Sequence, residues 1–265
     1  MRVARFSTGS DPVFGIVELA ADGGKHPDTV STLTGDPLSM PVQLTGERHE
    51  LDGVRLLAPV IPRSKVVGVG RNYAAHAAEL GNEVPTPPLI FLKPNTSVIG
   101  PDEPIIYPEP VTRLSYEGEL AVVIGRICRD VPAERVKDVI FGYTVANDVT
   151  ARDLQKSDGQ WARAKGYDTF CPLGPWITTH QSIEEMSDAM ITTTVDGIQR
   201  QHGSTSLMLR GITELVVYIS SFTTLLPGDV ILTGTPEGVG ELLPGHEVSI
   251  TVDGIGTLTN TVISK

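Results

Sequence analysis

Cysteine is scarce in this chain. Only Cys128 and Cys171 occur among the 265 residues, and they do not form a Cys-x-x-Cys pair. We therefore expect two free thiols, although the spacing alone leaves a single disulfide open. The N-terminus shows no sequence of charged, then apolar, then small residues of the kind that directs secretion, so we expect a reducing, cytoplasmic location.

Positive charge and long apolar runs are lacking too. Lysine and arginine number 21 against 32 acidic residues, which gives a formal net charge of −11. No basic run is present, and a phosphate backbone would be repelled, so we expect no nucleic-acid partner. No apolar stretch reaches the ~20 residues that a membrane span needs, so we expect no membrane partner. An anionic substrate would need local attraction, from a metal ion and from a few cations. The candidate cations are Arg71, Lys93, Arg152 and Lys165.

Glycine and proline, by contrast, are abundant. The 27 glycines and 20 prolines separate short alternating runs, a texture typical of many strands joined by turns. Asp-Gly pairs at 196–197 and 253–254 predict hairpin turns. Apolar residues within 207–222 recur with a helical period, which predicts a packing helix. The pattern favours an α+β fold in which strands dominate.

Two prolines, Pro59 and Pro62, stiffen a connector near residue 60. We place a boundary there and predict a small N-terminal domain, residues 1–58, followed by a larger domain, residues 59–265. The 40% hydrophobic content supports a genuine core in a chain of this length.

Glu117 and Glu119 lie one residue apart in a run, residues 116–124, that predicts a strand. Side chains alternate across a strand, so both glutamates point to one face while apolar residues line the other. Neighbouring carboxylates repel, so a fold that aims both at one place must hydrate them, pair them with Lys or Arg, or put a divalent cation between them. Oxygen ligands favour Mg²⁺, Mn²⁺ or Ca²⁺ over zinc.

Other segments of unusual chemistry accompany this strand in a fixed order. They are VGVGRNYAAHAAE at 67–79, FLKP at 91–94, ANDVTARDLQ at 146–155, WARAKGYDTFCPLGP at 161–175 and TGTPEGVG at 233–240. In this order and spacing they resemble the fumarylacetoacetate hydrolase family, from about residue 62 to the C-terminus. The first 58 or so residues resemble only the variable N-terminal segment of such proteins.

The resemblance implies a catalytic domain folded as a mixed β-sandwich roll and a homodimeric assembly. It implies that Asp148 joins Glu117 and Glu119 as the third metal ligand, with Mg²⁺ as the expected ion and Mn²⁺ or Ca²⁺ as substitutes. The expected partner is a small anionic 2-oxo acid, which would chelate the metal through its carboxylate and its 2-oxygen.

His76 and Glu79 lie at positions i and i+3, so on a helical turn they share one face and can act as a base and its orienting carboxylate. The resemblance places such a pair on a mobile lid segment, where it activates water. The nearby Gly68 and Gly70 do not indicate a dinucleotide site, because Tyr73 stands where the third glycine would be.

Further roles follow from the resemblance. Lys165 is a catalytic candidate that stabilises developing negative charge. Asp153 is expected to have a structural role, and Trp161 and Asp168 to be packing or turn residues. The substrate-binding candidates are Arg71, Tyr73, Lys93, Gln155 and Thr235.

The implied chemistry is a metal-bound enolate, which serves isomerisation, decarboxylation and hydrolysis alike. Residues 158–166 look more like the bacterial aromatic-catabolism and oxaloacetate-decarboxylase members than like the longer tyrosine-degradation hydrolase. We therefore expect action on 2-oxo or 2-hydroxydienoic dicarboxylic acids, of the 2-hydroxyhepta-2,4-diene-1,7-dioate isomerase or decarboxylase type. The alternatives are a C–C bond hydrolase of acylpyruvates, such as fumarylpyruvate or acetylpyruvate, and an oxaloacetate decarboxylase. A non-catalytic binding protein is disfavoured because every candidate ligand and base is present.

Overall fold

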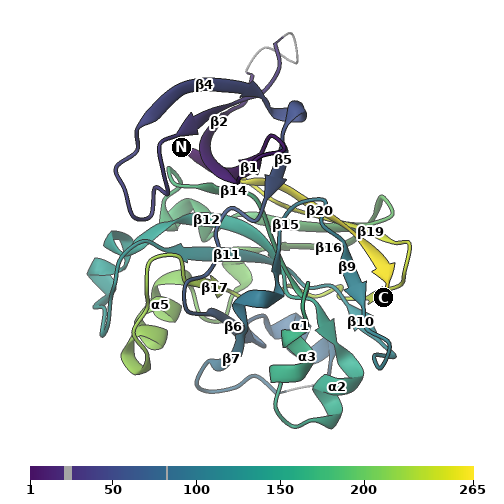
Figure 1. Ribbon diagram of the computed structural model, residues 1–265. Helices are drawn as coiled ribbons and strands as arrows, with labels where there is room; N and C mark the ends of the chain where they lie inside the picture. Colours follow the sequence, from purple (N-terminus) through teal and green to yellow (C-terminus); the bar gives the residue numbers. More distant parts are fainter. Residues whose placement is uncertain (21–25, 82) are drawn as a thin grey trace.

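The computed structural model in Figure 1 describes residues 1–20, 26–81 and 83–265. Strands dominate the described chain. Their bounds are β1 Arg2–Ser7, β2 Val13–Glu18, β3 Thr29–Leu33, β4 Leu44–Glu50, β5 Arg55–Leu57, β6 Val66–Gly70, β7 Leu89–Lys93, β8 Val98–Ile99, β9 Ile105–Tyr107, β10 Leu114–Ser115, β11 Gly118–Ile124, β12 Ile140–Asn147, β13 Thr150–Ala151, β14 Cys171–Thr178, β15 Met190–Val195, β16 Ile198–Ser204, β17 Val230–Leu232, β18 Glu241–Leu242, β19 Glu247–Val252 and β20 Gly256–Ser264. The α-helices are α1 Ala74–Glu79, α2 Arg152–Ser157, α3 Ala162–Gly166, α4 Ile183–Met186 and α5 Ile212–Phe222. The 3₁₀ turns are Leu51–Gly53, Asn95–Ser97, Ala133–Asp138 and Thr205–Leu207.

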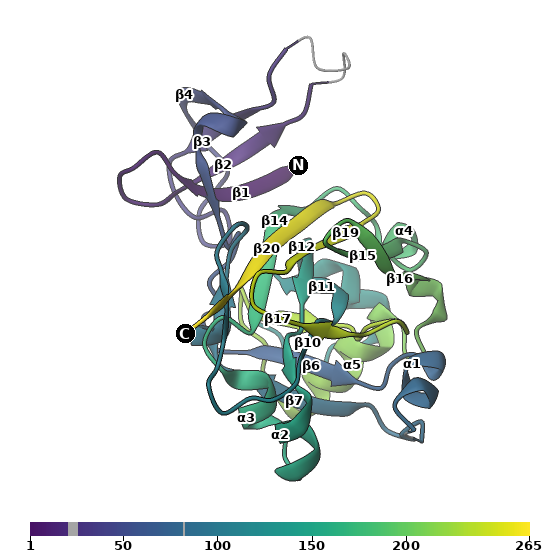
Figure 2. The same ribbon diagram turned by 90° about the vertical axis from the view of Figure 1, so that its right-hand side faces the viewer.

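A 12-stranded mixed sheet forms the body of the molecule. Ten of its strands follow the order β4-β3-β2-β1-β14-β12-β11-β17-β6-β7, and β5 and β8 pair with β1 and β14 outside this order. A 5-stranded sheet, β16-β15-β19-β20-β9, packs across its centre, and β13-β10-β18 form a third, small sheet. In both views the N-terminal strands lie at one end, and α1, α2 and α3 lie near β6 and β7 at the other (Figures 1 and 2). This arrangement confirms the strand-dominated α+β prediction.

The central strand β11 is buried on both faces. Leu120, Val122 and Ile124 belong to the larger hydrophobic cluster, which also takes in the 5-stranded sheet and α5. Ala121 and Val123 belong to a second cluster on the opposite face. Glu117 and Glu119, at the start of this strand, are only 5% and 2% exposed, so a fully hydrated glutamate pair is disfavoured.

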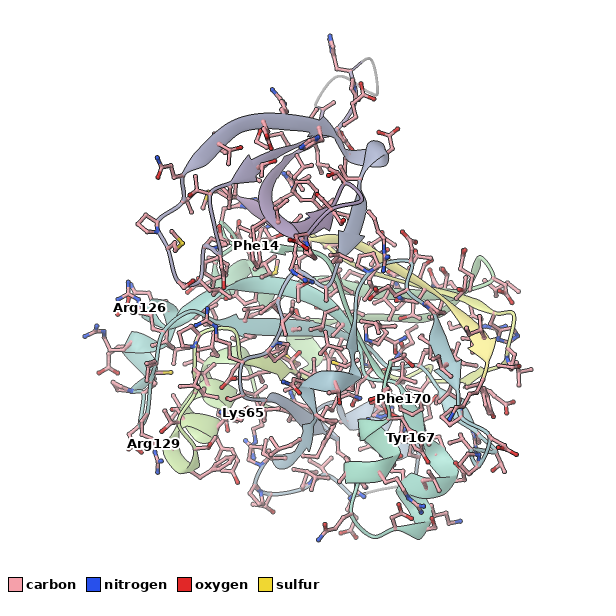
Figure 3. All side chains as sticks on the ribbon, in the orientation of Figure 1. Phe14, Lys65, Arg126, Arg129, Tyr167 and Phe170 are labelled. Carbon is pink, nitrogen blue, oxygen red and sulfur yellow. The ribbon has the colours of Figure 1, made fainter. Side chains whose placement is uncertain are left out.

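The N-terminal strands cover this second face. Strand β1 pairs with β14, with Arg2 opposite Thr178, and so continues the main sheet. Phe14 of β2, labelled in Figure 3, packs against the second cluster from the side of these strands. A small N-terminal unit is thus present but shares the main sheet. Its predicted boundary at residue 58 falls in the strand-free segment between β5 and β6 and stays a prediction.

Two local predictions are confirmed, and a third, the packing helix, is confirmed except for its start. The Asp-Gly turns join β15 to β16 and β19 to β20, and both cysteines are buried free thiols. The helix predicted over 207–222 begins only at Ile212, because Gly211 before it is extended and Met208 forms a β-bridge with Tyr73. Glycine weakens helix extension at that point. No helix in the described ranges is long and apolar enough to cross a membrane.

Asp229 fixes the starts of the two parallel strands β6 and β17. Its side chain is fully buried, and one oxygen accepts hydrogen bonds from the Ser64 hydroxyl at 2.7 Å and the Lys65 amide at 3.1 Å. The other accepts from Lys65 Nζ at 2.8 Å and the Leu226 amide at 2.9 Å. Lys65 is labelled in Figure 3.

We expect Asp229→Ala to lower the free energy of unfolding by about 3 kcal/mol. The substitution leaves several buried hydrogen-bond donors and the Lys65 ammonium without their acceptor. Chemical denaturation measures the loss. Asp138→Ala is the matched control, since it breaks the exposed Arg135–Asp138 ion pair and should cost less than about 1 kcal/mol. Equal losses in the two variants would contradict the assignment.

Candidate functional site

Three carboxylates meet where β11 begins and β12 ends. The antiparallel register puts Gly118 opposite Asn147, so Glu117 and Asp148 are adjacent, and the Asp148 amide donates to the Glu117 carbonyl at 2.9 Å. One side-chain oxygen from each of Glu117, Glu119 and Asp148 lies within 4.8 Å of the other two. All three residues are no more than 5% exposed. The strand pairing thus brings together the three predicted metal ligands.

Cationic side chains surround two of these carboxylates. Lys165 Nζ donates to Glu117 Oε2 at 2.7 Å and also to Asp148 Oδ2. Arg152 Nη2 lies 2.6 Å from Glu117 Oε1, and Lys93 Nζ donates to Asp148 Oδ1 at 2.5 Å. Burial alone would raise the pKa of Glu117, but Lys165, Arg152 and His76 together hold it well below its usual range.

Glu119 differs from the other two carboxylates in its partners. Within the described ranges it has no cationic partner in contact and accepts only the Gly234 amide, at 2.6 Å. Burial, followed by repulsion from Asp148 and Glu117, raises the pKa of Glu119 well above its usual value. A buried carboxylate repelled by two neighbours fits the place of a bound cation, and an all-oxygen donor set is the one that Mg²⁺ and Mn²⁺ prefer.

His76 and Glu79 share one side of α1, as their spacing predicts. His76 Nδ1 lies 3.4 Å from Glu79 Oε2, and His76 Nε2 lies 4.0 Å from Glu117 Oε1. Burial is the main reason that the pKa of His76 is lowered, so the imidazole is neutral at neutral pH. The Gly238 amide donates to both Glu79 oxygens, at 3.1 and 3.3 Å, and ties α1 to the 235–240 loop.

A cavity of about 610 Å³ opens above the carboxylates. The predicted residues in its lining are Arg71, His76, Glu79, Glu117, Glu119, Gln155, Lys165 and Thr235. Tyr73 and Lys93, which we expected to bind substrate, lie outside this lining and are each 1% exposed. The structure favours a packing role for Tyr73 and places Lys93 behind Asp148, where it neutralises that carboxylate.

The sequence profile described as fumarylacetoacetate (FAA) hydrolase C-terminal matches residues 65–263. The chain belongs to the fumarylacetoacetate hydrolase family. A second profile, described as Rv2993c-like, N-terminal, matches residues 1–59. The family resemblance seen in the sequence is therefore confirmed.

Relatives within this family cover most of the chain. Protein Rv2993c of Mycobacterium tuberculosis is 50% identical over 265 residues, which cover 100% of this chain and 99% of that protein. The oxaloacetate tautomerase YisK of Bacillus subtilis is 40% identical over 258 residues, covering 93% of this chain and 86% of that protein.

Two solved structures of relatives are similar to this chain. That of 5-carboxymethyl-2-hydroxymuconate delta-isomerase from Mycobacterium smegmatis is 51% identical, with a TM-score of 0.90 and full coverage of both chains. That of fumarylpyruvate hydrolase from Pseudomonas aeruginosa, in complex with Mn²⁺ and pyruvate, is 36% identical with a TM-score of 0.73, covering 77% of this chain and 91% of that one.

The sequence did not predict every residue that lines the cavity. Trp161, predicted to be a packing residue, lines the cavity, with the Arg71 guanidinium 6.0 Å and Lys165 Nζ 5.9 Å from its ring. Trp161 lies four residues before Lys165, and this helical spacing could have indicated that the two side chains lie together. Asp153 has the structural role predicted for it, since it accepts hydrogen bonds from the Thr112 amide and hydroxyl, both at 2.8 Å.

Gln201 gave no signal in the sequence, yet it fixes the strand that carries the glutamates. Its Oε1 accepts the Gly118 amide at 3.0 Å and the Thr193 hydroxyl at 2.8 Å. Its Nε2 donates to Thr235 Oγ1 and to the Pro236 carbonyl, both at 2.8 Å. Gly118 lies between the two glutamates, so this buried amide couples their spacing to the 235–240 loop.

We expect Gln201→Leu to weaken Mn²⁺ binding at least tenfold, as is typical when a partner behind metal ligands is lost. The loss of buried hydrogen bonds should also reduce stability by about 3 kcal/mol. Calorimetric titration with Mn²⁺ measures the first effect and denaturation the second. Gln199→Leu, on the exposed part of the same strand, is the control. Unchanged Mn²⁺ affinity in Gln201→Leu would refute the coupling.

Proposed function

We propose that this protein is a Mg²⁺-dependent isomerase of small 2-oxo or 2-hydroxydienoic dicarboxylic acids, of the 2-hydroxyhepta-2,4-diene-1,7-dioate type. The observation that carries the proposal is the buried carboxylate triad next to a neutral histidine, with Glu117, Glu119 and His76 lining a cavity of about 610 Å³. Glu117, Glu119 and Asp148 would hold the metal ion. When bound, it supplies a Lewis acid that stabilises negative charge on the substrate oxygens.

His76 would move the proton. If Nδ1 carries the hydrogen shared with Glu79, then Nε2, which faces the triad, is the free acceptor. A base in this position removes the 2-hydroxyl proton of a 2-hydroxydienoic acid and delivers a proton to C5 of the resulting conjugated enolate, which gives the 2-oxo-3-enoic acid. Glu79 would orient the ring, and its bonds to the Gly238 amide would keep α1 closed over the cavity.

Lys165 would balance charge rather than transfer protons. Burial alone would lower its pKa, but the attraction of Asp148 and Glu117 raises it, so the ammonium is retained. Arg71, Gln155 and Thr235 line the cavity and would orient the substrate. Thr235 is itself fixed, because its hydroxyl donates to the Gly118 carbonyl at 2.8 Å.

The names of the relatives favour isomerisation over hydrolysis and decarboxylation. The Mycobacterium smegmatis protein is named an isomerase at 51% identity, and the Bacillus subtilis protein is named a tautomerase. Hydrolysis of an acylpyruvate is the second candidate, because the His76–Glu79 pair can also activate a water and the Pseudomonas aeruginosa relative is named a hydrolase. A homodimer and a cytoplasmic location stay proposals that rest on the family resemblance.

The division of roles is tested by two variants. We expect Glu119→Ala to abolish both Mn²⁺ binding and turnover, and His76→Ala to bind Mn²⁺ with wild-type affinity while losing turnover by about 100-fold or more. Titration calorimetry and steady-state assays give the two readouts. Equal behaviour of the two variants would refute the division, and full activity of His76→Ala would favour decarboxylation, which needs no base.

The reaction itself is tested with metal-stripped protein reloaded with Mg²⁺ or Mn²⁺. We expect 2-hydroxyhepta-2,4-diene-1,7-dioate to isomerise, seen as a metal-dependent change in its ultraviolet absorbance. Fumarylpyruvate and acetylpyruvate, followed by pyruvate release, test hydrolysis, and oxaloacetate, followed by loss of CO₂, tests decarboxylation. Metal-dependent turnover of an acylpyruvate alone would replace isomerase with hydrolase, and no turnover of any substrate would reject the proposal.

A further inference from the structure

Two cations in the cavity lining are not used by the site described above. Arg113 precedes β10, and Lys156 lies in α2. Neither side chain makes a hydrogen bond or ion pair with any residue that the structure describes. Arg152 and Lys165, in contrast, are both committed to Glu117. The cavity therefore contains positive charge beyond what its own carboxylates take up.

Backbone geometry gathers these two cations on one side of the cavity. The Arg152 amide donates to the Arg113 carbonyl at 2.8 Å, next to the pairing of Leu114 with Ala151. Lys156 lies four residues after Arg152 on α2, and residues at this spacing share a helix face. One turn of helix carries Lys156 about 6 Å along the axis from Arg152, the residue that contacts Glu117.

The two acidic residues that flank Lys156 in sequence are engaged with other partners. Asp153 lies between Arg152 and Lys156 in sequence, but its Oδ2 is taken by the Thr112 amide and hydroxyl. Asp158, just after α2, accepts two hydrogen bonds from Arg163, at 2.6 and 2.7 Å. In a chain with 32 acidic residues against 21 basic ones, two cations without an acidic partner at a cavity are a notable excess.

We propose that Arg113 and Lys156 bind the distal carboxylate of the substrate and so select dicarboxylic over monocarboxylic 2-oxo acids. This inference rests on the proposed function, because the 2-oxo end of the same molecule must be held at the triad. Arg113 offers a planar pair of donors that matches a carboxylate, and Lys156 adds a flexible ammonium. The remaining net charge of the chain repels anions, so discrimination depends on this local pair.

The test compares two acids that differ only at the far end, 2-oxoheptanedioate and 2-oxoheptanoate, with oxalate as a probe of the triad alone. Binding to the Mn²⁺-loaded full chain is measured by titration calorimetry. We expect the wild type to bind the dioate at least tenfold more tightly than the monoacid. Arg113→Met/Lys156→Met should bind the two acids within twofold of each other, with oxalate affinity unchanged.

Arg126→Met/Arg129→Met is the matched control, because it removes two positive charges from exposed positions at the opposite side of the molecule (Figure 3). It should keep the wild-type preference. Retention of the preference in Arg113→Met/Lys156→Met, or its absence in the wild type, while oxalate still binds would overturn the distal subsite alone. Failure of all three ligands to bind in a metal-dependent manner would overturn the proposed function and the subsite together.

Discussion

Three carboxylates buried within 4.8 Å of one another repel strongly, and much of the surrounding structure compensates for that repulsion. Lys93, Lys165 and Arg152 reach the cluster from three different parts of the chain and neutralise Glu117 and Asp148. Among the described residues, Glu119 receives only a backbone amide, from Gly234. The protein thus neutralises two carboxylates of the cluster with its own side chains, and the third is the one that a cation could neutralise.

Burial of the cluster depends on layers that lie far from it. The 5-stranded sheet and α5 cover one face of β11, and the N-terminal strands extend the cover on the other face through the second hydrophobic cluster. A strand covered on both sides cannot shift its register without moving apolar side chains into polar surroundings. The N-terminal segment therefore contributes to the rigidity of the strand that carries Glu119, although none of its described residues lines the cavity.

Local patterns in the sequence predicted those parts of the site that are built locally. Alternation along one strand placed Glu117 and Glu119 together, and helical spacing paired His76 with Glu79. Gln201 escaped notice because its partners lie about 80 and 35 residues away, and a lone glutamine in a strand carries no periodic signal. The position of Tyr73 and Lys93 outside the cavity lining was not predictable for a related reason: a motif identifies which residues are near a site, whereas side-chain direction depends on packing between distant elements.

The pairing of β1 with β14 has a consequence for synthesis. Arg2 and Thr178 are neighbours in the sheet but are made far apart in time. The first strands must leave the ribosome and wait, with an open hydrogen-bonding edge, until most of the chain has been translated. Non-local strand pairing of this kind is slow to form, and unpaired edges attract other chains. The edge of β1 at Arg2 and Val3, which later pairs with β14, is thus the part of the nascent protein that we expect a chaperone to bind.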